Sequence, residues 1–464
     1  MFNYSSFSTN IACITSDNNS YTYHDLDNFT RDMSKYMRYK SLCFILCSNT
    51  IGSLVGYLSA LRSDAVTLLL NKDIDEELLM NLIDIYKPTY LWLPKEKKLY
   101  TDGLEFYSNW GYSLIKLDKP YVELYEDLSL LLTTSGTTGS PKLVRLSKNN
   151  LKANAASIIE YLHINENERA VTSLPMYYSF GLSVINSHLM AGATLLLTDY
   201  SYIQKEFWSF AITNGVTSFS GVPYTYEILD KMRFWKRDIP TLKTMTQAGG
   251  KLNNHLIETF ATQARDKNIK FYIMYGQTEA TARMSYLPPT NVFTKLGSIG
   301  IAIPNGHFEI ECDSGIVNEP NVVGELVYRG ENVSLGYAES LADLKKDDEN
   351  KSVLYTGDLA YFDEDGFYYI VGRKKRFLKL FGNRISLDYV ETLLKTYFVD
   401  SDFACVGTDE RMIIYLTNPN IDTDILSFLM AKLKLNKNVF EIRYINTIPH
   451  SETGKVQYAN LSII

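Results

Sequence analysis

Short apolar runs alternate with helically spaced apolar residues between Leu130 and Gly276. The runs have the length of strands and are apolar on both faces, as in sheets that are covered on both sides. After Ser147, a suitable helix N-cap, apolar residues recur at helical spacing. The strand runs are Leu130–Leu132, Ala193–Leu197 and Phe271–Met274, and the helical positions are Leu151, Ala155, Ile158 and Leu162. The pattern predicts an α/β fold with parallel sheets flanked by helices.

The pattern changes near Gly297, where glycine and proline begin to separate short β-type segments. Gly324–Tyr337 has a strand pattern, and the acidic segment Asp363–Gly366 separates two further apolar runs. The spacing of these acids does not match an EF-hand, so we interpret the segment as a hairpin turn. A β-rich subdomain is therefore expected after the α/β portion.

The C-terminal residues predict a separate, small α+β domain. The expected elements are a helix carrying Leu387, Val390, Leu394 and Tyr397, strands at Phe403–Val406 and Met412–Leu416, a helix at Asp422–Leu433 and a strand at Glu441–Ile445. The charged turn Arg373–Arg376 is the expected boundary. We therefore predict a large domain at residues 1–375 and a small, mobile domain at residues 376–464.

Composition narrows the class of protein. The 464 residues carry 46 basic and 53 acidic side chains, a formal charge of −7, which argues against non-specific binding to nucleic acid or a membrane surface. The proportions of aromatic residues, 13%, and charged residues, 21%, exclude global disorder. The most apolar region, Leu42–Leu70, is interrupted by polar and charged residues, so no integral membrane segment is expected. The scattered cysteines and the lack of a signal-peptide pattern predict a cytoplasmic protein with buried thiols.

A loop of glycines and hydroxyl residues follows a strand in LLTTSGTTGSPKLV, Leu131–Val144. Glycines let successive N–H groups point at one anion, while hydroxyls and a lysine add donors and charge. Pro141 occupies the position where a Walker A motif needs glycine, which disfavours a P-loop phosphotransferase. Composition alone leaves both a phosphate cradle and a plain turn open. The candidate phosphate ligands are Thr134, Ser135, Gly136, Thr137, Thr138, Gly139 and Lys142.

The string SGTTGSPK in this loop closely resembles a motif of the adenylate-forming, or AMP-binding, superfamily of acyl-CoA synthetases, peptide-synthetase adenylation domains and luciferases. Other motifs that resemble those of the superfamily follow in the family's order. They are YGQTEA (275–280), GELVYRGENVSLGY (324–337), YTGDL (355–359), GRKKRFLK (372–379) and TGKVQY (453–458). The second of these is interpreted as a structural element. The resemblance implies that the large domain binds ATP and Mg²⁺.

The resemblance assigns roles in YGQTEA. Tyr275 would stack on adenine with Gly276 beside it, and Thr278 would contact the α-phosphate. Glu279 would hold Mg²⁺ near the ATP phosphates. An aromatic face suits a base and a carboxylate suits a hard cation, so the residue types fit these roles.

The resemblance also assigns roles near the domain boundary and in the small domain. Asp358 would accept both ribose hydroxyls, and Arg373 would contact the ribose. Lys455 would bridge the acid's carboxylate and the α-phosphate as the catalytic lysine. In the family the small domain rotates between half-reactions. Arg376 stands at the hinge, where Asp or Lys is usual, and Gly382 stands in the hairpin that lines the thiol tunnel.

The segment LPMYYSFG (174–181) resembles the family's P-x-x-H-x-x-G motif beside the acid pocket. Tyr178 takes the gate position, followed by Ser179 and Gly181, while Gly249 and Gly250 resemble the segment where nucleotide and acyl sites meet. Positions 179–183 contain no carboxylate to pair with a substrate ammonium group. An aryl or acyl acid is therefore favoured. An amino-acid-activating adenylation domain is the alternative, and a non-catalytic AMP-binding module is less favoured because the charged motif residues are retained.

The implied reaction is that of an AMP-forming acid–thiol ligase. A small carboxylic acid attacks the α-phosphate of ATP to give acyl-AMP and pyrophosphate, and a thiol then forms a thioester and releases AMP. Mg²⁺, Lys142 and Lys455 would screen the charge of the reacting anions. CoA and the phosphopantetheine of an acyl or peptidyl carrier protein are nearly equal candidates for the thiol, with a slight preference for the carrier protein.

Overall fold

A computed structural model describes residues 1–97, 103–119, 122–133, 142–374, 376–380, 383–399, 401–408, 410–450 and 456–461. The chain forms two compact units. Unit 1 comprises Met1–Leu296, Gly300–His307 and Tyr328–Leu354, and unit 2 comprises Gly297–Ile299, Phe308–Val327 and Tyr355–Ile464.

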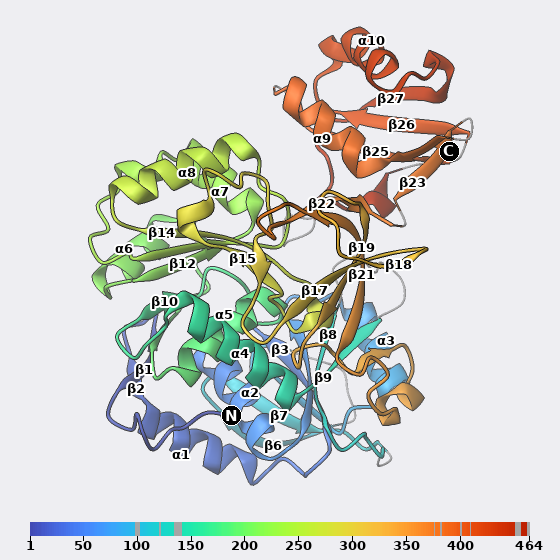
Figure 1. The fold of residues 1–464 in the computed structure, drawn as a ribbon. Coiled ribbons are helices and arrows are strands. Elements are labelled where there is room, and N and C mark those ends of the chain that lie inside the picture. The colour runs from blue at the N-terminus through green and yellow to red at the C-terminus, as the bar shows by residue number, and fades with distance from the viewer. Residues whose placement is uncertain are drawn as a thin grey trace. The chain divides into compact units, whose positions relative to one another are not determined.

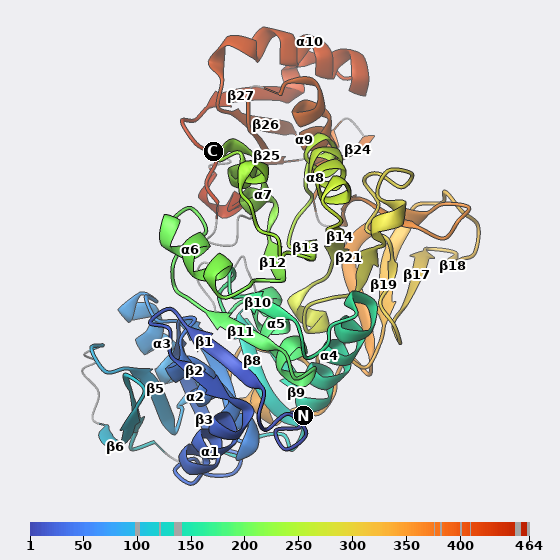
Figure 2. The ribbon, with the colours of Figure 1, turned by 90° about the vertical axis from the view of Figure 1, so that its left-hand side faces the viewer.

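Unit 1 contains a nine-stranded sheet in the order β16-β15-β14-β13-β12-β10-β11-β1-β2. The strands from β14 to β1 in this order run parallel, and the pairings β14–β15, β15–β16 and β1–β2 are antiparallel. The strands are β1 (Ile11–Thr15), β2 (Ser20–Thr22), β10 (Arg169–Val171), β11 (Thr194–Leu197), β12 (Ser218–Gly221), β13 (Thr244–Gln247), β14 (Lys270–Tyr275), β15 (Ser285–Leu287) and β16 (Ile301–Ala302). Helices cover both faces, with α7 and α8 on one side and α4 and α5 on the other (Figures 1 and 2).

The second sheet of unit 1 has eight strands in the order β20-β9-β8-β4-β3-β5-β7-β6. They are β3 (Leu42–Cys47), β4 (Val66–Asn71), β5 (Tyr90–Pro94), β6 (Leu104–Asn109), β7 (Tyr112–Lys116), β8 (Leu128–Thr133), β9 (Leu143–Ser147) and β20 (Gly336–Ala338). All six residues of β3 are buried, as expected of a strand with two covered faces. The predicted strand runs thus belong to two sheets, because Leu130–Leu132 lies in this one and Ala193–Leu197 in the nine-stranded sheet.

The helices of unit 1 connect and cover these strands. They are α1 (Tyr23–Ser34), α2 (Ile51–Arg62), α3 (Glu76–Tyr86), α4 (Lys148–Leu162), α5 (Ser179–Met190), α6 (Lys205–Thr213), α7 (Pro223–Lys231) and α8 (Asn254–Asp266). The predicted N-cap of α4 is confirmed, because Ser147 accepts from the Asn150 N–H and Asn150 caps the Ser147 N–H in return. One turn after Asn150, the Asn154 Nδ2 donates to the Arg283 carbonyl oxygen at 2.9 Å. Helix α4 thereby fixes the loop between β14 and β15.

Unit 2 contains the predicted β-rich sheet, in the order β18-β17-β19-β21-β22. Its strands are β17 (His307–Cys312), β18 (Gly315–Val317), β19 (Gly324–Arg329), β21 (Val353–Phe362) and β22 (Tyr368–Arg373). The hairpin turn at Asp363–Gly366 is confirmed, because β21 and β22 pair antiparallel on either side of it. The Asp363 Oδ1 accepts from the backbone N–H groups of Asp365 and Phe367, so this acid stabilises the turn.

The C-terminal residues of unit 2 form the predicted α+β arrangement. The elements are β23 (Phe377–Leu380), β24 (Asn383–Ser386), α9 (Leu387–Tyr397), β25 (Phe403–Thr408), β26 (Arg411–Leu416), α10 (Asp422–Leu433) and β27 (Phe440–Tyr444). Leu387, Val390 and Leu394 on one stripe of α9 are buried in a cluster with residues of β25, β26 and α10. The domain boundary at residues 375 and 376 stays a prediction, since compactness alone groups this region with the β-rich sheet.

Short 3₁₀ turns complete the described elements: η1 (Phe234–Lys236), η2 (Thr278–Ala280), η3 (Pro289–Asn291), η4 (Leu341–Lys345), η5 (Pro419–Ile421), η6 (Lys437–Val439) and η7 (Tyr458–Asn460). All five cysteines are free thiols, and each of them except Cys312 is buried. Among the described helices, none combines the length and the apolar character needed to cross a bilayer.

Candidate active site

Lys142 directly precedes β9, where pairing with β20 brings Tyr337 beside it. The antiparallel register sets Tyr337 opposite Val144. The Lys142 Nζ lies 3.7 Å from the centroid of the Tyr337 ring and 3.8 Å from Glu339 Oε1. An aromatic face attracts a cation through its quadrupole, and this attraction holds the ammonium group in place. The predicted phosphate-binding lysine is thus anchored by residues that are remote in sequence.

Tyr337 also contacts Glu279, the predicted magnesium ligand in η2. Its hydroxyl donates to Glu279 Oε1 at 2.8 Å. Burial and the neighbouring carboxylate raise the pKa of Tyr337 above its ordinary value, so the hydroxyl stays protonated and donates. A single oriented carboxylate fits Mg²⁺, which nucleotide sites hold through one or two carboxylates together with phosphate oxygens.

Tyr337 therefore links Lys142 to Glu279, and sequence reasoning missed this role. The motif that contains Tyr337, GELVYRGENVSLGY (324–337), resembles a structural element of the family, so the sequence assigns Tyr337 no role in the site. Only the pairing of β20 with β9 shows that the aromatic residue at its end meets the other two motifs. In the sequence, the signal for this role was the tyrosine that ends this motif.

A cavity of about 430 Å³ opens beside Lys142. The residues that line it are Lys142, Gly336, Tyr337, Glu339, Asp343, Lys346, Glu349 and Asn350. Its lining carries three carboxylates and two lysines, a balance that does not favour a polyphosphate on its own. The residues predicted to bind phosphate through their N–H groups and hydroxyls come from the loop that precedes Lys142.

Residues of the predicted acid pocket meet at the start of α5. The hydroxyl oxygens of Ser179 and Thr278 lie 3.1 Å apart, within hydrogen-bonding distance. Tyr178 is the N-cap residue of α5, and burial raises its pKa to about 12 although nearby Arg283 acts to lower it. A Cβ on Gly249 would lie 2.6 Å from the Tyr178 hydroxyl, and the Gly249 φ of +86° disfavours any side chain. Gly249 thus lets the tyrosine reach the end of β13.

The other predicted glycines of unit 1 are packed closely. A Cβ on Gly276 would lie 1.7 Å from the Ala282 carbonyl oxygen, so glycine lets the loop after Tyr275 fold back on itself. The Tyr275 hydroxyl accepts from Gln277 Nε2 at 3.1 Å. Gly181 lies against the carbonyl of Pro175 and Gly250 against Pro223. These contacts give Gly181 a packing role within α5.

Asp358 and Arg373 lie opposite each other on β21 and β22 of unit 2. The Arg373 Nε lies 3.0 Å from Asp358 Oδ1, and the Asp358 side chain is only 4% exposed while that of Arg373 is 59% exposed. The cross-strand pairing therefore brings the two predicted ribose-binding residues together. Their contact with a ribose stays a prediction.

Arg376, the predicted hinge residue, is fixed within unit 2. Its guanidinium forms ion pairs with Asp388 and with Glu391, the latter at 2.9 Å. The guanidinium also stacks 3.7 Å from the centroid of the Tyr458 ring, and the Tyr458 hydroxyl donates to Glu391 Oε2 at 2.9 Å. Tyr458 follows Lys455 by three positions in the TGKVQY motif. The hinge residue thus anchors the segment that follows the predicted catalytic lysine.

The remaining predicted site residues lie outside the described residues. They are Thr134, Ser135, Gly136, Thr137, Thr138, Gly139, Gly382 and Lys455.

Comparison with known proteins decides the family. A model of the AMP-binding enzyme family matches residues 5–338. The chain belongs to the AMP-binding enzyme family. Among its relatives, a 2-succinylbenzoate–CoA ligase of Bacillus cereus (strain AH820) is 29% identical over 354 residues, covering 73% of this chain and 71% of the relative. A ligase of the same name from Oceanobacillus iheyensis is 26% identical over 345 residues, with 73% and 70% coverage.

Solved structures share the fold of this AMP-binding enzyme. O-succinylbenzoate coenzyme A synthetase of Bacillus subtilis in complex with AMP superposes with a TM-score of 0.79 at 21% identity, covering 97% of this chain and 95% of that one. The same synthetase with ATP and a magnesium ion gives a TM-score of 0.77 at 21% identity, with 97% and 96% coverage. ATP-bound MatB of Rhodopseudomonas palustris gives a TM-score of 0.77 at 18% identity, with 97% and 95% coverage.

These comparisons confirm the predicted superfamily, the α/β fold class and the enzyme class, an ATP-dependent, AMP-forming acid–thiol ligase. Binding of ATP and Mg²⁺ is confirmed at the level of the family. The roles of individual residues stay predictions.

Proposed function

We propose that this AMP-binding enzyme joins an aryl acid of the 2-succinylbenzoate type to CoA through an acyl-AMP intermediate. The curated relatives are named for that acid and for CoA. The absence of a carboxylate at positions 179–183 agrees with an acid that has no α-amino group. Because the relatives are CoA ligases, we now favour CoA over a carrier protein as the thiol donor.

The observation that carries the proposal is the Tyr337 link between Lys142 and Glu279. It brings a cation and a carboxylate from separate motifs into one cluster of unit 1. Such a pair suits a reaction in which one anion attacks another, because the cation neutralises phosphate charge and the carboxylate holds a metal ion. Mg²⁺ bound at Glu279 would supply further neutralisation of the ATP phosphates.

The other residues have positioning and charge-screening roles in the proposed reaction. Tyr275 would stack on adenine, and Asp358 would accept the ribose hydroxyls through its two oxygens. Thr278 would donate to the α-phosphate. Lys455 would screen charge between the acid's carboxylate and the α-phosphate during adenylation and withdraw before thiol attack. Charge screening of this kind lowers the barrier to the attack of the acid on ATP.

The test is ATP–pyrophosphate exchange across a panel of acids, followed by thioester formation with either acceptor. The panel contains 2-succinylbenzoate, benzoate, short and long fatty acids and amino acids. We expect 2-succinylbenzoate to stimulate exchange most and CoA to accept the acyl group. Exchange with amino acids alone would contradict the proposed substrate, and transfer only to a holo-carrier protein would contradict the proposed acceptor.

A further inference from the structure

Arg283 carries a positive charge in the interior of unit 1. The residue is only 1% exposed and follows Thr278 and Glu279 in the loop between β14 and β15. Burial lowers its pKa from the ordinary value, but a guanidinium remains protonated in proteins. A buried cation is costly unless an anion or several hydrogen bonds compensate it.

The partners of this guanidinium are all neutral. Its Nε donates to Ser183 Oγ and its Nη1 to the Tyr161 hydroxyl, each at 3.2 Å. Its central carbon lies 4.2 Å from the centroid of the Phe180 ring, and Met274 Sδ accepts from Nη1. Within the described part of the chain, no carboxylate pairs with Arg283 and no hydrogen bond from its Nη2 is found. The two Nη2 hydrogens therefore remain for another acceptor.

The position of Arg283 connects it to the predicted acid pocket. Phe180 and Ser183 lie on the first turns of α5, directly after Tyr178 and Ser179. The positive charge of Arg283 acts to lower the pKa of the Tyr178 hydroxyl, and this hydroxyl packs against Gly249. Helix α5 has no acidic residue in its first turn and no side-chain cap, so its dipole adds positive potential at the same place.

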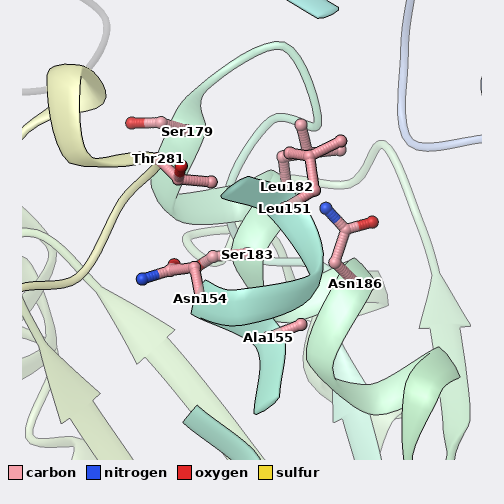
Figure 3. A pocket seen from close by; sticks show the side chains of 8 residues that line it. All are labelled: Leu151, Asn154, Ala155, Ser179, Leu182, Ser183, Asn186 and Thr281. Carbon is pink, nitrogen blue, oxygen red and sulfur yellow. The ribbon is translucent and has the colours of Figure 1, made fainter. Parts of the chain in front are cut away.

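A small cavity adjoins this arrangement (Figure 3). Ser183, which accepts from Arg283, and Ser179, which meets Thr278, both line it. Its volume is about 10 Å³, which is enough for about one water molecule and too little for an acid. Binding of an acid next to Arg283 therefore requires a side-chain movement at the start of α5, where Tyr178 and Phe180 are the bulky residues.

We propose that Arg283 determines substrate specificity by receiving the second carboxylate of a dicarboxylic acid, the carboxylate that is not adenylated. This inference rests on the proposed function and adds the group that selects the substrate. The second carboxylate would supply the anion that the buried guanidinium lacks, through hydrogen bonds from Nη2. An acid with one carboxylate would leave the guanidinium unpaired.

The experiment compares acid-dependent kcat/KM in pyrophosphate release for the wild-type protein. The substrates are 2-succinylbenzoate, the two monoacids that each lack one of its carboxylates (3-benzoylpropionate and 2-propanoylbenzoate), and a carboxamide of each carboxylate. We expect the dicarboxylate to exceed by about 10²-fold the monoacid and the monoamide that keep the reacting carboxylate, the effect of losing a charge-assisted pair in a buried site. The two compounds without a free reacting carboxylate should release no pyrophosphate. This comparison needs no variant, so it does not depend on folding of a mutant.

The same comparison is made for Arg283→Gln and Arg283→Lys. We expect Arg283→Gln to reduce kcat/KM for the dicarboxylate by about 10²-fold and for the active monoacid by far less, with partial recovery in Arg283→Lys. A fall that is equal for both acids would assign Arg283 a purely structural role and overturn the inference. The matched control is Arg265→Gln, which removes an exposed arginine of α8 that pairs with Asp266.

Failure of the inference and failure of the proposed function give different results. Wild-type activity on a monoacid equal to that on the dicarboxylate would overturn the role of Arg283 and leave the ligase reaction intact. Lack of activity with every acid of this series would overturn the proposed substrate and, with it, the inference.

Discussion

Replacing Tyr337 with phenylalanine removes one hydroxyl and leaves the ring against Lys142. The lost contact is the hydrogen bond to Glu279 Oε1 at 2.8 Å. A hydrogen bond to a charged group contributes roughly 1.5–3 kcal/mol, or about 10- to 100-fold in an equilibrium constant. Because Glu279 is only half-buried, we take the lower end of this range. The expected result is a rise of about tenfold in the Mg²⁺ concentration that half-saturates the enzyme. Removing a hydrogen-bond partner of a metal ligand typically weakens metal binding by about 10- to 100-fold.

The assay is ATP–pyrophosphate exchange at fixed ATP over a range of Mg²⁺ concentrations. The matched control is Tyr328→Phe, which deletes a buried hydroxyl that donates to Asn332 Oδ1 at 2.9 Å. We expect the control to lose stability without a change in Mg²⁺ dependence. A wild-type Mg²⁺ dependence in Tyr337→Phe would refute the argument that Tyr337 orients the magnesium ligand.

Two further predictions concern the C-terminal residues. Lys455→Ala should fold normally and lose about 10²–10³-fold in exchange activity, and activity within about twofold of the wild type would contradict its catalytic role. Arg376→Ala should destabilise the C-terminal part of unit 2 by about 3–5 kcal/mol, because the buried Glu391 loses its cationic partner. Hydrogen exchange over residues 383–399 measures this loss, and Arg376→Lys, which keeps the charge, should lose less. Unchanged protection in Arg376→Ala would exclude the anchoring role.

Local patterns predicted much of the fold because helices and turns depend on neighbours in the sequence. The spacing after Ser386 and the segment Asp422–Leu433 predicted α9 and α10 closely. The division of the strands between two sheets was not predictable from periodicity. A buried apolar run such as Leu130–Leu132 does not specify which strand it pairs with.

The site shows the same division between local and non-local information. The motifs identified Lys142, Glu279 and Asp358 as residues, but their partners depend on strand register. Tyr337 reaches Glu279 only because β20 pairs with β9. Arg283 lies outside every motif. The sequence around a single arginine does not reveal whether an acidic residue pairs with it in the folded chain. The burial and neutral partners of Arg283 became visible only in the folded chain.

Direct detection of the intermediate tests the central claim. The enzyme is mixed with 2-succinylbenzoate, ATP and Mg²⁺ without CoA, the reaction is quenched, and the products are identified by mass spectrometry before and after addition of CoA. We predict an acyl-adenylate that accumulates without CoA and is converted to acyl-CoA and AMP when CoA is added. Formation of ADP, or an adenylate that CoA leaves unchanged, would contradict the assignment as an AMP-forming acid–CoA ligase.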